Sequence, residues 1–250
     1  MKKYLALLLV AGILICISTG CKKKEDQGDP PALPAIDEIT IDLNYFDISK
    51  SGSKGIEDNY FEIASEIVTT WIPIVEQTLS VPIATCEHLA NLSAGDAKWV
   101  TKNTWEWKFT FLGKAVNVTA VIGSSITWTV TIDSFEWATG TSNTAGTSGT
   151  WKIKESSAIT SELLKIDWAV SGTSITSIKY TCSSGNYNGS HMTYTPTATG
   201  ADYSASLTGS HNSAPYSVEW NATSGVGRIK YQSEFGDSEW RTWNANKENI

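Results

Sequence analysis

The stretch Trp105-Glu106-Trp107-Lys108-Phe109-Thr110-Phe111 places a large aromatic side chain at every second position, with polar side chains between them. This period of two is typical of a β-strand with one buried face and one face in water, because successive side chains of a strand point to opposite faces. Gly113 and Lys114 follow directly and suit a tight turn. The stretch therefore predicts a half-buried strand that leads into an antiparallel hairpin.

The same alternation continues from this strand almost to the end of the chain. Further apolar runs of this period cover residues 116–122, 126–132, 135–137, 151–153, 164–170, 178–182, 192–194, 203–207, 216–220 and 229–231. The segments between the runs are too short for the helical crossovers that parallel strands need. The sequence therefore predicts a mainly β (α+β) fold, an antiparallel meander of about ten or eleven strands that forms a barrel or half-barrel.

A helical period precedes the sheet. Between residues 56 and 79, apolar residues recur at spacings of three and four, which predicts one amphipathic helix that fills the concave side of the sheet. Pro73 should kink or split this helix. The predicted inner face consists of Tyr60, Ile63, Ala64, Ile67, Trp71, Val75 and Leu79, widened by Phe61, Val68 and Ile72. Residues 39–45 alternate like a short extended segment, and the Ser, Thr and Gly of residues 140–149 predict a mobile loop.

The chain holds 11 tryptophans, which raises the question of a sugar-binding surface. Their register argues for core packing instead, because most share a strand face with Phe, Ile and Val. The residues interpreted in this way are Trp105, Trp107, Trp128, Trp168 and Trp220. Trp240 and Trp243 are the better candidates for an exposed aromatic pair, although packing over one end of the barrel is the expected role there as well.

The first residues have the layout of an export signal. Lys2 and Lys3 precede an apolar run that is too short to span a bilayer, and small residues follow it. The sequence Ser18-Thr19-Gly20-Cys21 resembles a bacterial lipobox, so residues 1–20 are predicted to be removed and Cys21 to carry lipid. The alternative is an ordinary secreted protein with an incidental cysteine. The charged, proline-containing residues 21–38 are predicted to be a flexible tether, and residues 39–250 a single β-rich domain.

Charge and cysteine content limit the partners. The net charge is −7 and cationic residues are not clustered beyond the tether, so nucleic acid is not an expected partner. Only Cys86 and Cys182 remain in the folded part, in a compartment that permits disulfides. The pair is interpreted either as a disulfide or as two buried free thiols.

Residue patterns of known chemistries are not found in the sequence. The histidines His88, His191 and His211 are not spaced as paired metal ligands, even with Cys86 and Cys182 added, so no metal site is predicted. The chain has no G-x-S-x-G motif and no phosphate-binding glycine motif, and we expect neither catalytic residues nor a cofactor. Asp167 and Glu219 alternate with inward-facing tryptophans and are interpreted as surface acids.

Several segments carry a resemblance to a known group of proteins. They are Leu33-Pro34, Thr139-Gly140-Thr141-Ser142-Asn143, Gly149-Thr150-Trp151, Ile166-Asp167-Trp168, Val218-Glu219-Trp220-Asn221 and Phe235-Gly236-Asp237-Ser238-Glu239-Trp240-Arg241-Thr242-Trp243. Together they resemble an uncharacterised family of Bacteroidetes lipoproteins, and the lysines and acids after Cys21 resemble the surface-export signal of such proteins. The resemblance implies export and one compact β-rich domain, without an assigned activity. Some members end in Cys, where this chain has Ile250.

These observations predict a non-enzymatic envelope protein, anchored by lipid at Cys21 to the outer membrane on its periplasmic or outer side. Its curved sheet would bind or carry an apolar small molecule, as small barrels often do. The alternatives are a surface glycan-binding module and a structural lipoprotein with no ligand. Two exposed aromatic rings in one plane would distinguish the glycan-binding module.

Overall fold

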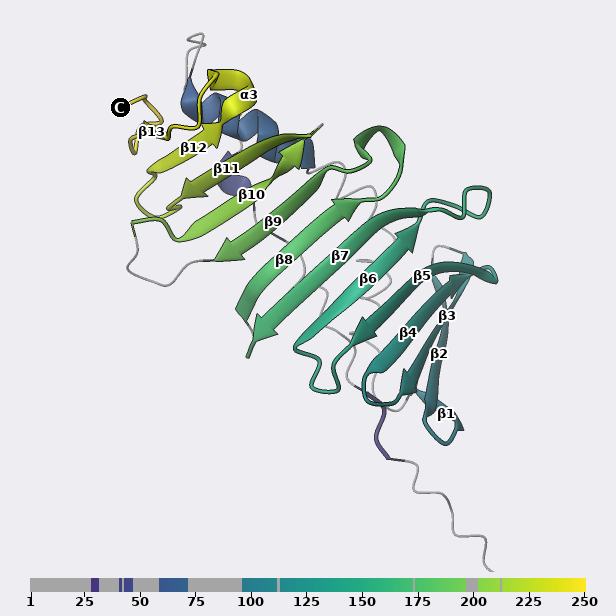
Figure 1. The fold of residues 1–250 in the computed structure, drawn as a ribbon. Coiled ribbons are helices and arrows are strands. Elements are labelled where there is room, and N and C mark those ends of the chain that lie inside the picture. The colour runs from purple at the N-terminus through teal and green to yellow at the C-terminus, as the bar shows by residue number, and fades with distance from the viewer. Residues whose placement is uncertain are drawn as a thin grey trace, which may run out of the picture.

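The computed structural model describes residues 28–31, 41, 43–46, 59–71, 96–111, 113–172, 174–196, 202–211 and 213–250. Thirteen strands form one sheet, and each strand pairs antiparallel with the next in sequence (Figure 1). They are β1 Lys98–Thr101, β2 Thr104–Phe111, β3 Lys114–Ile122, β4 Ile126–Ile132, β5 Phe135–Ser142, β6 Ser148–Lys154, β7 Glu162–Ser171, β8 Ser174–Cys182, β9 His191–Pro196, β10 Ala205–His211, β11 Ala214–Trp220, β12 Gly227–Tyr231 and β13 Arg241–Trp243. The short helices η1 Asn44–Phe46, η4 Gly185–Tyr187 and α3 Gln232–Phe235 accompany them.

The predicted antiparallel meander is confirmed, but the predicted number of strands is too low. All eleven predicted runs contribute to strands, and β1 and β13 are the additions. These two strands have four and three residues, which is too short for an alternating pattern to stand out. They form the two edges of the sheet, which is open rather than closed by hydrogen bonds among the described strands.

One face of the sheet carries the core. Trp105, Trp107, Trp128, Trp168 and Trp220 are all buried there, with at most 6% of each side chain exposed. This confirms the interpretation of these tryptophans as core residues. On β3 the buried residues Val116, Val118 and Ala120 share one parity, while the polar residues between them lie on the other face. Alternation therefore assigns the faces as predicted.

Glycines opposite aromatic residues allow the core rings to lie close to the neighbouring strand. The pairs in register are Gly140 with Trp151, Gly149 with Trp168, Gly209 with Tyr216, and Gly227 with Trp243. A Cβ atom at Gly140 would come within 2.6 Å of the Trp151 ring, which is closer than real contacts allow. Glycine at these positions thus makes room for a ring over the backbone.

This pairing corrects the prediction of a mobile loop at residues 140–149. Residues 140–142 belong to β5 and residues 148–149 to β6, so the connection covers only residues 143–147. The Ser, Thr and Gly residues are typical of loops, but here the small side chains accompany large rings on the neighbouring strands. Asn143 closes the short loop by accepting the Thr147 backbone N–H at 2.8 Å.

The predicted helix is present over residues 60–71. The Asn59 side chain caps its first turn by accepting the backbone N–H groups of Phe61 and Glu62 at 2.9 and 3.1 Å. The fully buried apolar residues are Phe61, Ala64, Val68 and Trp71. Pro73 and the predicted continuation to residue 79 lie outside the described residues.

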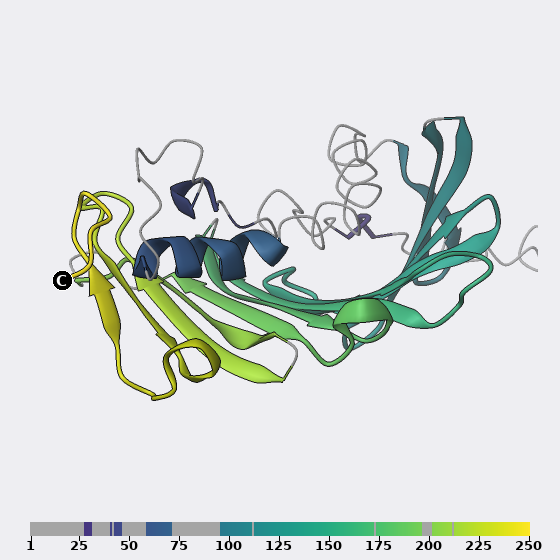
Figure 2. The same cartoon turned by 90° about the horizontal axis from the view of Figure 1, so that it is seen from above.

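The buried face of this helix is rotated relative to the prediction. Tyr60, Ile63 and Ile67, expected at its centre, are only partly buried, whereas Phe61 and Val68 are sealed. The helix is apolar on most sides, so spacing alone does not single out one stripe. Figure 2 shows the helix lying over the sheet near β9 to β12. The Phe61 ring meets the Trp243 indole edge to face at 5.8 Å between centroids.

A second segment from the N-terminal part closes the same end of the sheet. Residues 44–46 form the turn η1, so the extended segment predicted for residues 39–45 is wrong where the structure describes it. The Phe46 ring packs on Trp220 at 5.0 Å between centroids. The Tyr45 hydroxyl accepts the Trp243 indole N–H at 2.9 Å and donates to the Gly225 carbonyl at 2.8 Å. Burial raises the pKa of Tyr45 to about 12.

Candidate functional site

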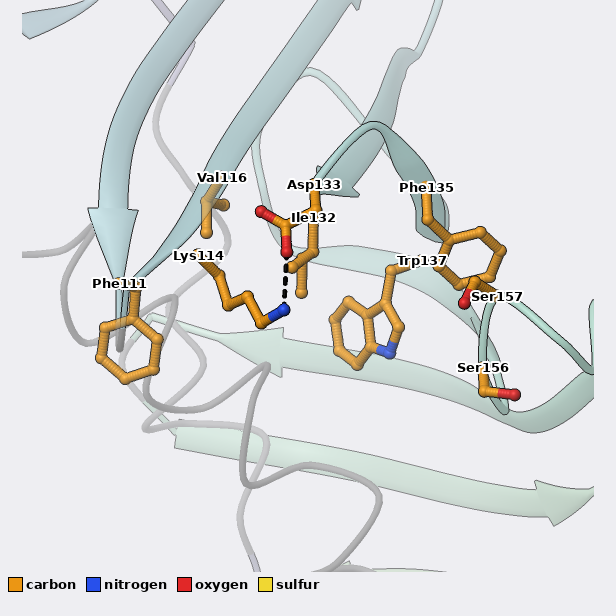
Figure 3. Close-up of a pocket in the computed structure, with 9 residues that line it drawn as sticks. All are labelled: Phe111, Lys114, Val116, Ile132, Asp133, Phe135, Trp137, Ser156 and Ser157. Atoms are coloured by element: carbon orange, nitrogen blue, oxygen red, sulfur yellow. Dashed lines mark hydrogen bonds and ion pairs between the residues drawn. The ribbon is translucent and has the colours of Figure 1, made fainter.

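A cleft opens on the core face at the end of β2 to β5, where the turns between these strands lie. Its volume is about 370 Å³. We call it the hairpin cleft and define it by its lining residues, Phe111, Lys114, Val116, Ile132, Asp133, Phe135, Trp137, Ser156 and Ser157 (Figure 3). The volume lies at the lower end of the range for small-molecule sites, roughly 300 to 1,000 Å³.

The floor of the cleft follows from strand register. Val116 on β3 stands opposite Ile132 on β4, and both have the parity of the buried face. Phe111 ends β2 and pairs with Lys114, the first residue of β3. Val116 is buried, whereas Phe111 and Ile132 are half-buried because the strands end here. The floor is therefore apolar and open on one side.

A β-bulge brings the aromatic wall into place. Val130 pairs with Ala138, but its neighbour Thr131 pairs with Glu136, so Trp137 is an extra residue on β5. A bulge redirects the side chains beside it and is frequent next to binding sites. Phe135 and Trp137 consequently both line the cleft while Ala138 stays buried, and both rings remain half-buried. This agrees with the predicted inner-face placement of these two residues.

One ion pair crosses the mouth of the cleft. The Lys114 ammonium donates to Oδ2 of Asp133 at 2.7 Å, and the Ala115 backbone N–H donates to Oδ1 at 3.0 Å. The hydrogen bond from Lys114, followed by that from Ala115, holds the pKa of the Asp133 carboxyl below its usual range, and the same pair raises the pKa of Lys114. Asp133 has a positive φ of 48° in the turn.

No motif in the sequence marks Lys114 and Asp133 as part of a site, although one signal pointed to Lys114. Lys114 has the same parity as Val116, Val118 and Ala120, so the alternation of β3 places a cation on the core face. The bulge at Trp137 left no such sign in the sequence, because it depends on how two strands pair.

The remaining rim residues come from the connection after β6. The Ser156 Oγ accepts the Ile159 backbone N–H at 3.1 Å, which holds this turn. Figure 3 shows Ser157 beside Phe135 and the indole of Trp137 facing the same opening. The cleft thus combines aromatic walls with hydroxyl, indole and ammonium donors, which suits binding of a small molecule.

Of the three cysteines predicted to carry lipid or to form a disulfide, the structure describes only Cys182. Cys21 and Cys86 lie outside the described residues. Cys182 ends β8, is buried and forms no disulfide within the described part of the chain, and burial raises the pKa of its thiol to about 11. With its proposed partner undescribed, the choice between a disulfide and two buried thiols stays a prediction.

The two candidate tryptophans do not form an exposed pair. Trp243 is fully buried beneath Phe61 and Tyr45, which agrees with the packing role expected for it. Trp240 is half-buried, and its face is covered by the Arg228 guanidinium at 4.2 Å and the Lys230 ammonium at 4.8 Å. The closing segment packs its rings against the rest of the chain instead of presenting them as a flat platform.

Asp167 and Glu219 both lie on the face opposite the core, as predicted. Glu219 pairs with Arg228 at 2.5 Å, and Asp167 pairs with Lys165 at 2.8 Å. Partial burial alone would raise the pKa of Asp167, but hydrogen bonds from Lys165 and Thr150 bring it below its usual value. Each acid is thus held in a surface ion pair.

The histidines of the described strands lie in separate environments. The His191 Nδ1 lies 3.0 Å from the Ser210 hydroxyl, and the His211 ring packs near Tyr187 at 5.8 Å. Within the described part of the chain, no three His, Cys, Asp or Glu side chains are grouped as metal ligands. His88 lies outside that part.

In three comparisons with known proteins, no family model, no curated protein and no solved structure matches this chain. The resemblance to Bacteroidetes lipoproteins rests on the sequence segments alone and stays a prediction. Among the helices that the structure describes, none combines the length and apolar character needed to cross a bilayer.

Proposed function

We propose that this chain is a lipid-anchored binding protein of the cell envelope that takes a small apolar molecule into the hairpin cleft. The observation that carries the proposal is the cleft itself, with three half-buried aromatic rings around about 370 Å³ on the core face. Half-buried rings retain apolar surface, and covering that surface with a ligand contributes roughly 25 cal/mol per Å².

The proposal places the ligand at one end of the sheet instead of along its whole concave side. The open sheet would act as a half-barrel whose β9 to β13 end is already filled. There Phe46, Phe61 and Trp71 are fully buried against the strands. A ligand at that end would have to displace close-packed side chains, which is costly. The hairpin cleft needs no such displacement.

Anchoring follows from the predicted lipidation of Cys21. Several acyl chains together would hold the protein at the outer membrane, since each buried methylene contributes about 0.8 kcal/mol. Residues 21–38 would act as the tether between membrane and sheet, and residues 1–20 would be removed. Labelled palmitate should enter the wild-type protein and not Cys21→Ser, and equal labelling of both would exclude this anchor.

The glycan-binding alternative has less support than at the outset. It depended on two exposed aromatic rings near the end of the chain, and Trp243 is buried while Trp240 is covered by cations. The apolar ligand is therefore the function that the geometry favours. A purely structural lipoprotein remains the outcome if the cleft binds nothing.

Binding is tested with the mature chain, residues 21–250, carrying Cys21→Ser so that neither acyl chains nor detergent compete for the probe. Titration with the neutral fluorescent probe N-phenyl-naphthylamine should give saturable binding. Trp137→Ala removes one wall and should weaken that binding about tenfold, which corresponds to about 1.4 kcal/mol.

Trp240→Ala is the matched control, because it removes another half-buried indole far from the cleft, on the opposite face. It should leave probe affinity unchanged. Organic extraction of the wild-type protein followed by mass spectrometry should also release a stoichiometric apolar compound. If the probe does not saturate, or both variants weaken it equally, the cleft is not the binding site.

A further inference from the structure

The hydrogen-bonding groups of the hairpin cleft are used unevenly. Both carboxylate oxygens of Asp133 already accept, one from the Lys114 ammonium and one from the Ala115 N–H. An ammonium carries three N–H donors, and Lys114 uses one of them on Asp133. Within the described part of the chain, the Trp137 indole N–H and the Ser157 hydroxyl have no hydrogen-bond partner. The cleft thus keeps unused donors on Lys114, Trp137 and Ser157.

The cation is also the polar group best placed to meet a ligand. Lys114 lies on the core face of β3, the same face as the buried residues Val116 and Val118. In Figure 3 its side chain extends between Phe111 and Trp137, with the ammonium toward the opening. Its side chain is 62% exposed, so a ligand reaches it without opening the fold.

These two observations favour a ligand with acceptor oxygens. A hydrogen bond from an ammonium to an ionised acid is roughly twice as strong as one between neutral groups. A cationic ligand would be repelled by the Lys114 ammonium, and Asp133, the one acid that lines the cleft, is already paired with that ammonium. A neutral hydrocarbon would leave the donors of Lys114 and Trp137 without partners where it covers them, which is unfavourable.

We infer that the hairpin cleft selects amphipathic anions, with a carboxylate, sulfonate or phosphate group on Lys114 and a compact apolar body against Phe111 and Trp137. The inference rests on the proposed function and specifies the ligand class of that same site. The volume of about 370 Å³ fits one ring system or a short chain, and a two-chain phospholipid is too large.

The overall charge of −7 does not attract such a ligand over long distances. At physiological ionic strength the Debye length is about 8 Å, so surface charges further away are largely screened. Contact with Lys114 therefore decides the selectivity. Affinity for anions should accordingly fall when this one residue loses its charge.

Two probes with one skeleton test the inference. Anilinonaphthalene sulfonate is N-phenyl-naphthylamine with an added sulfonate, so the pair differs by the anionic group alone. The mature chain with Cys21→Ser should bind the sulfonate about tenfold more tightly than the neutral probe. Lys114→Met should bring the ratio of the two affinities to about one, and because both probes meet the same altered lining, this ratio isolates the loss of charge.

Two further variants separate charge at the cleft from other effects. Lys108→Met makes the same change on the outer face of β2, where Lys108 pairs with Glu106 at 2.9 Å, and should change neither affinity. Asp133→Asn keeps an acceptor for the Ala115 N–H and suits the positive φ of 48° at this position. It frees Lys114, so sulfonate affinity should stay equal or rise.

The outcomes distinguish the two proposals. The neutral probe could bind with an affinity that Trp137→Ala lowers, while the sulfonate binds no more tightly than the neutral probe or loses no affinity in Lys114→Met. In that case the anion preference is wrong and the apolar site stands. If Asp133→Asn weakens the sulfonate as much as Lys114→Met does, the ion pair only holds the turn, which also overturns the inference. If neither probe saturates, the proposed function fails together with the inference.

Discussion

The two ends of the sheet contain the same kind of residues in different states. At the β9 to β13 end, the rings of Phe61, Trp71 and Trp243 are fully buried. At the β2 to β5 end, the rings that line the hairpin cleft are half-buried. Trp243 on β13 and the cleft rings on β2 and β5 lie on the core face of the sheet, whereas Phe61 and Trp71 belong to the helix that packs on that face. Strand alternation therefore decides which face a ring of the sheet occupies. Whether the ring is sealed depends on what covers it.

Polar groups show the same contrast. At the sealed end, the Trp243 indole N–H donates to the Tyr45 hydroxyl, and this hydroxyl donates to the Gly225 carbonyl. At the cleft, Lys114 bonds to Asp133 and keeps further donors for the opening. Buried polar groups need internal partners, whereas groups at an open site keep capacity for a ligand.

The largest expected difference between the ends is in stability. Trp243→Ala removes a fully buried ring from beneath the helix and should lower the free energy of unfolding by about 3 to 5 kcal/mol. Trp137→Ala removes a half-buried ring and should have a clearly smaller effect. Guanidinium unfolding of the two variants compares them directly. Equal losses would mean that the cleft is as tightly packed as the sealed end.

A smaller effect is expected between the two ends, in the middle of the sheet. Gly140→Ala would place a methyl group 2.6 Å from the Trp151 ring, and overpacking of this kind costs about 1 to 3 kcal/mol. Gly123→Ala is the matched control, because its nearest atom is the Ser125 carbonyl at 3.5 Å. Thermal unfolding should separate the two variants, and similar melting temperatures would show that Trp151 adapts without cost.

Much of the architecture was predictable because side-chain direction in a strand has a fixed period. The alternation from Trp105 onward predicted an antiparallel meander and the inner tryptophans correctly. It missed β1 and β13, whose four and three residues are too few to show a period. The loop predicted at residues 140–149 was wrong because Gly140 and Gly149 make room for rings on other strands.

The candidate site was less predictable, since it depends on pairing between strands. The Lys114 parity was visible in the sequence, but its partner Asp133 comes from the next hairpin. Trp137 reaches the cleft through a register shift against β4. Trp243 was only a candidate for an exposed ring, and the helix and η1 cover it; the docking of these two elements leaves no mark on the local pattern.

The smallest expected difference concerns two lysines, one at each end. Hydrogen bonding to Asp133 raises the pKa of Lys114, whereas burial lowers the pKa of Lys247 to about 8. The Lys247 ammonium lies 3.5 Å from the Tyr45 ring centre and donates to the Gly225 carbonyl at 2.9 Å. These contacts favour the charged form, but they only partly offset the lost hydration.

The pH dependence follows from the sign of this shift. Between pH 8 and the ordinary lysine pKa of 10.5, the unfolded chain binds more protons at Lys247 than the folded chain, so stability should rise with pH there. The buried Cys182 thiol and Tyr45 act oppositely, but only above their ordinary pKa values of 9 and 10, which leaves a clear window below pH 9. Solvent screening of the half-exposed ammonium limits the gain to about 1 kcal/mol or less. Urea unfolding from about pH 7 to 9 should show the rise in wild type and in Lys114→Met, but not in Lys247→Met. A rise that persists in Lys247→Met would place its origin elsewhere.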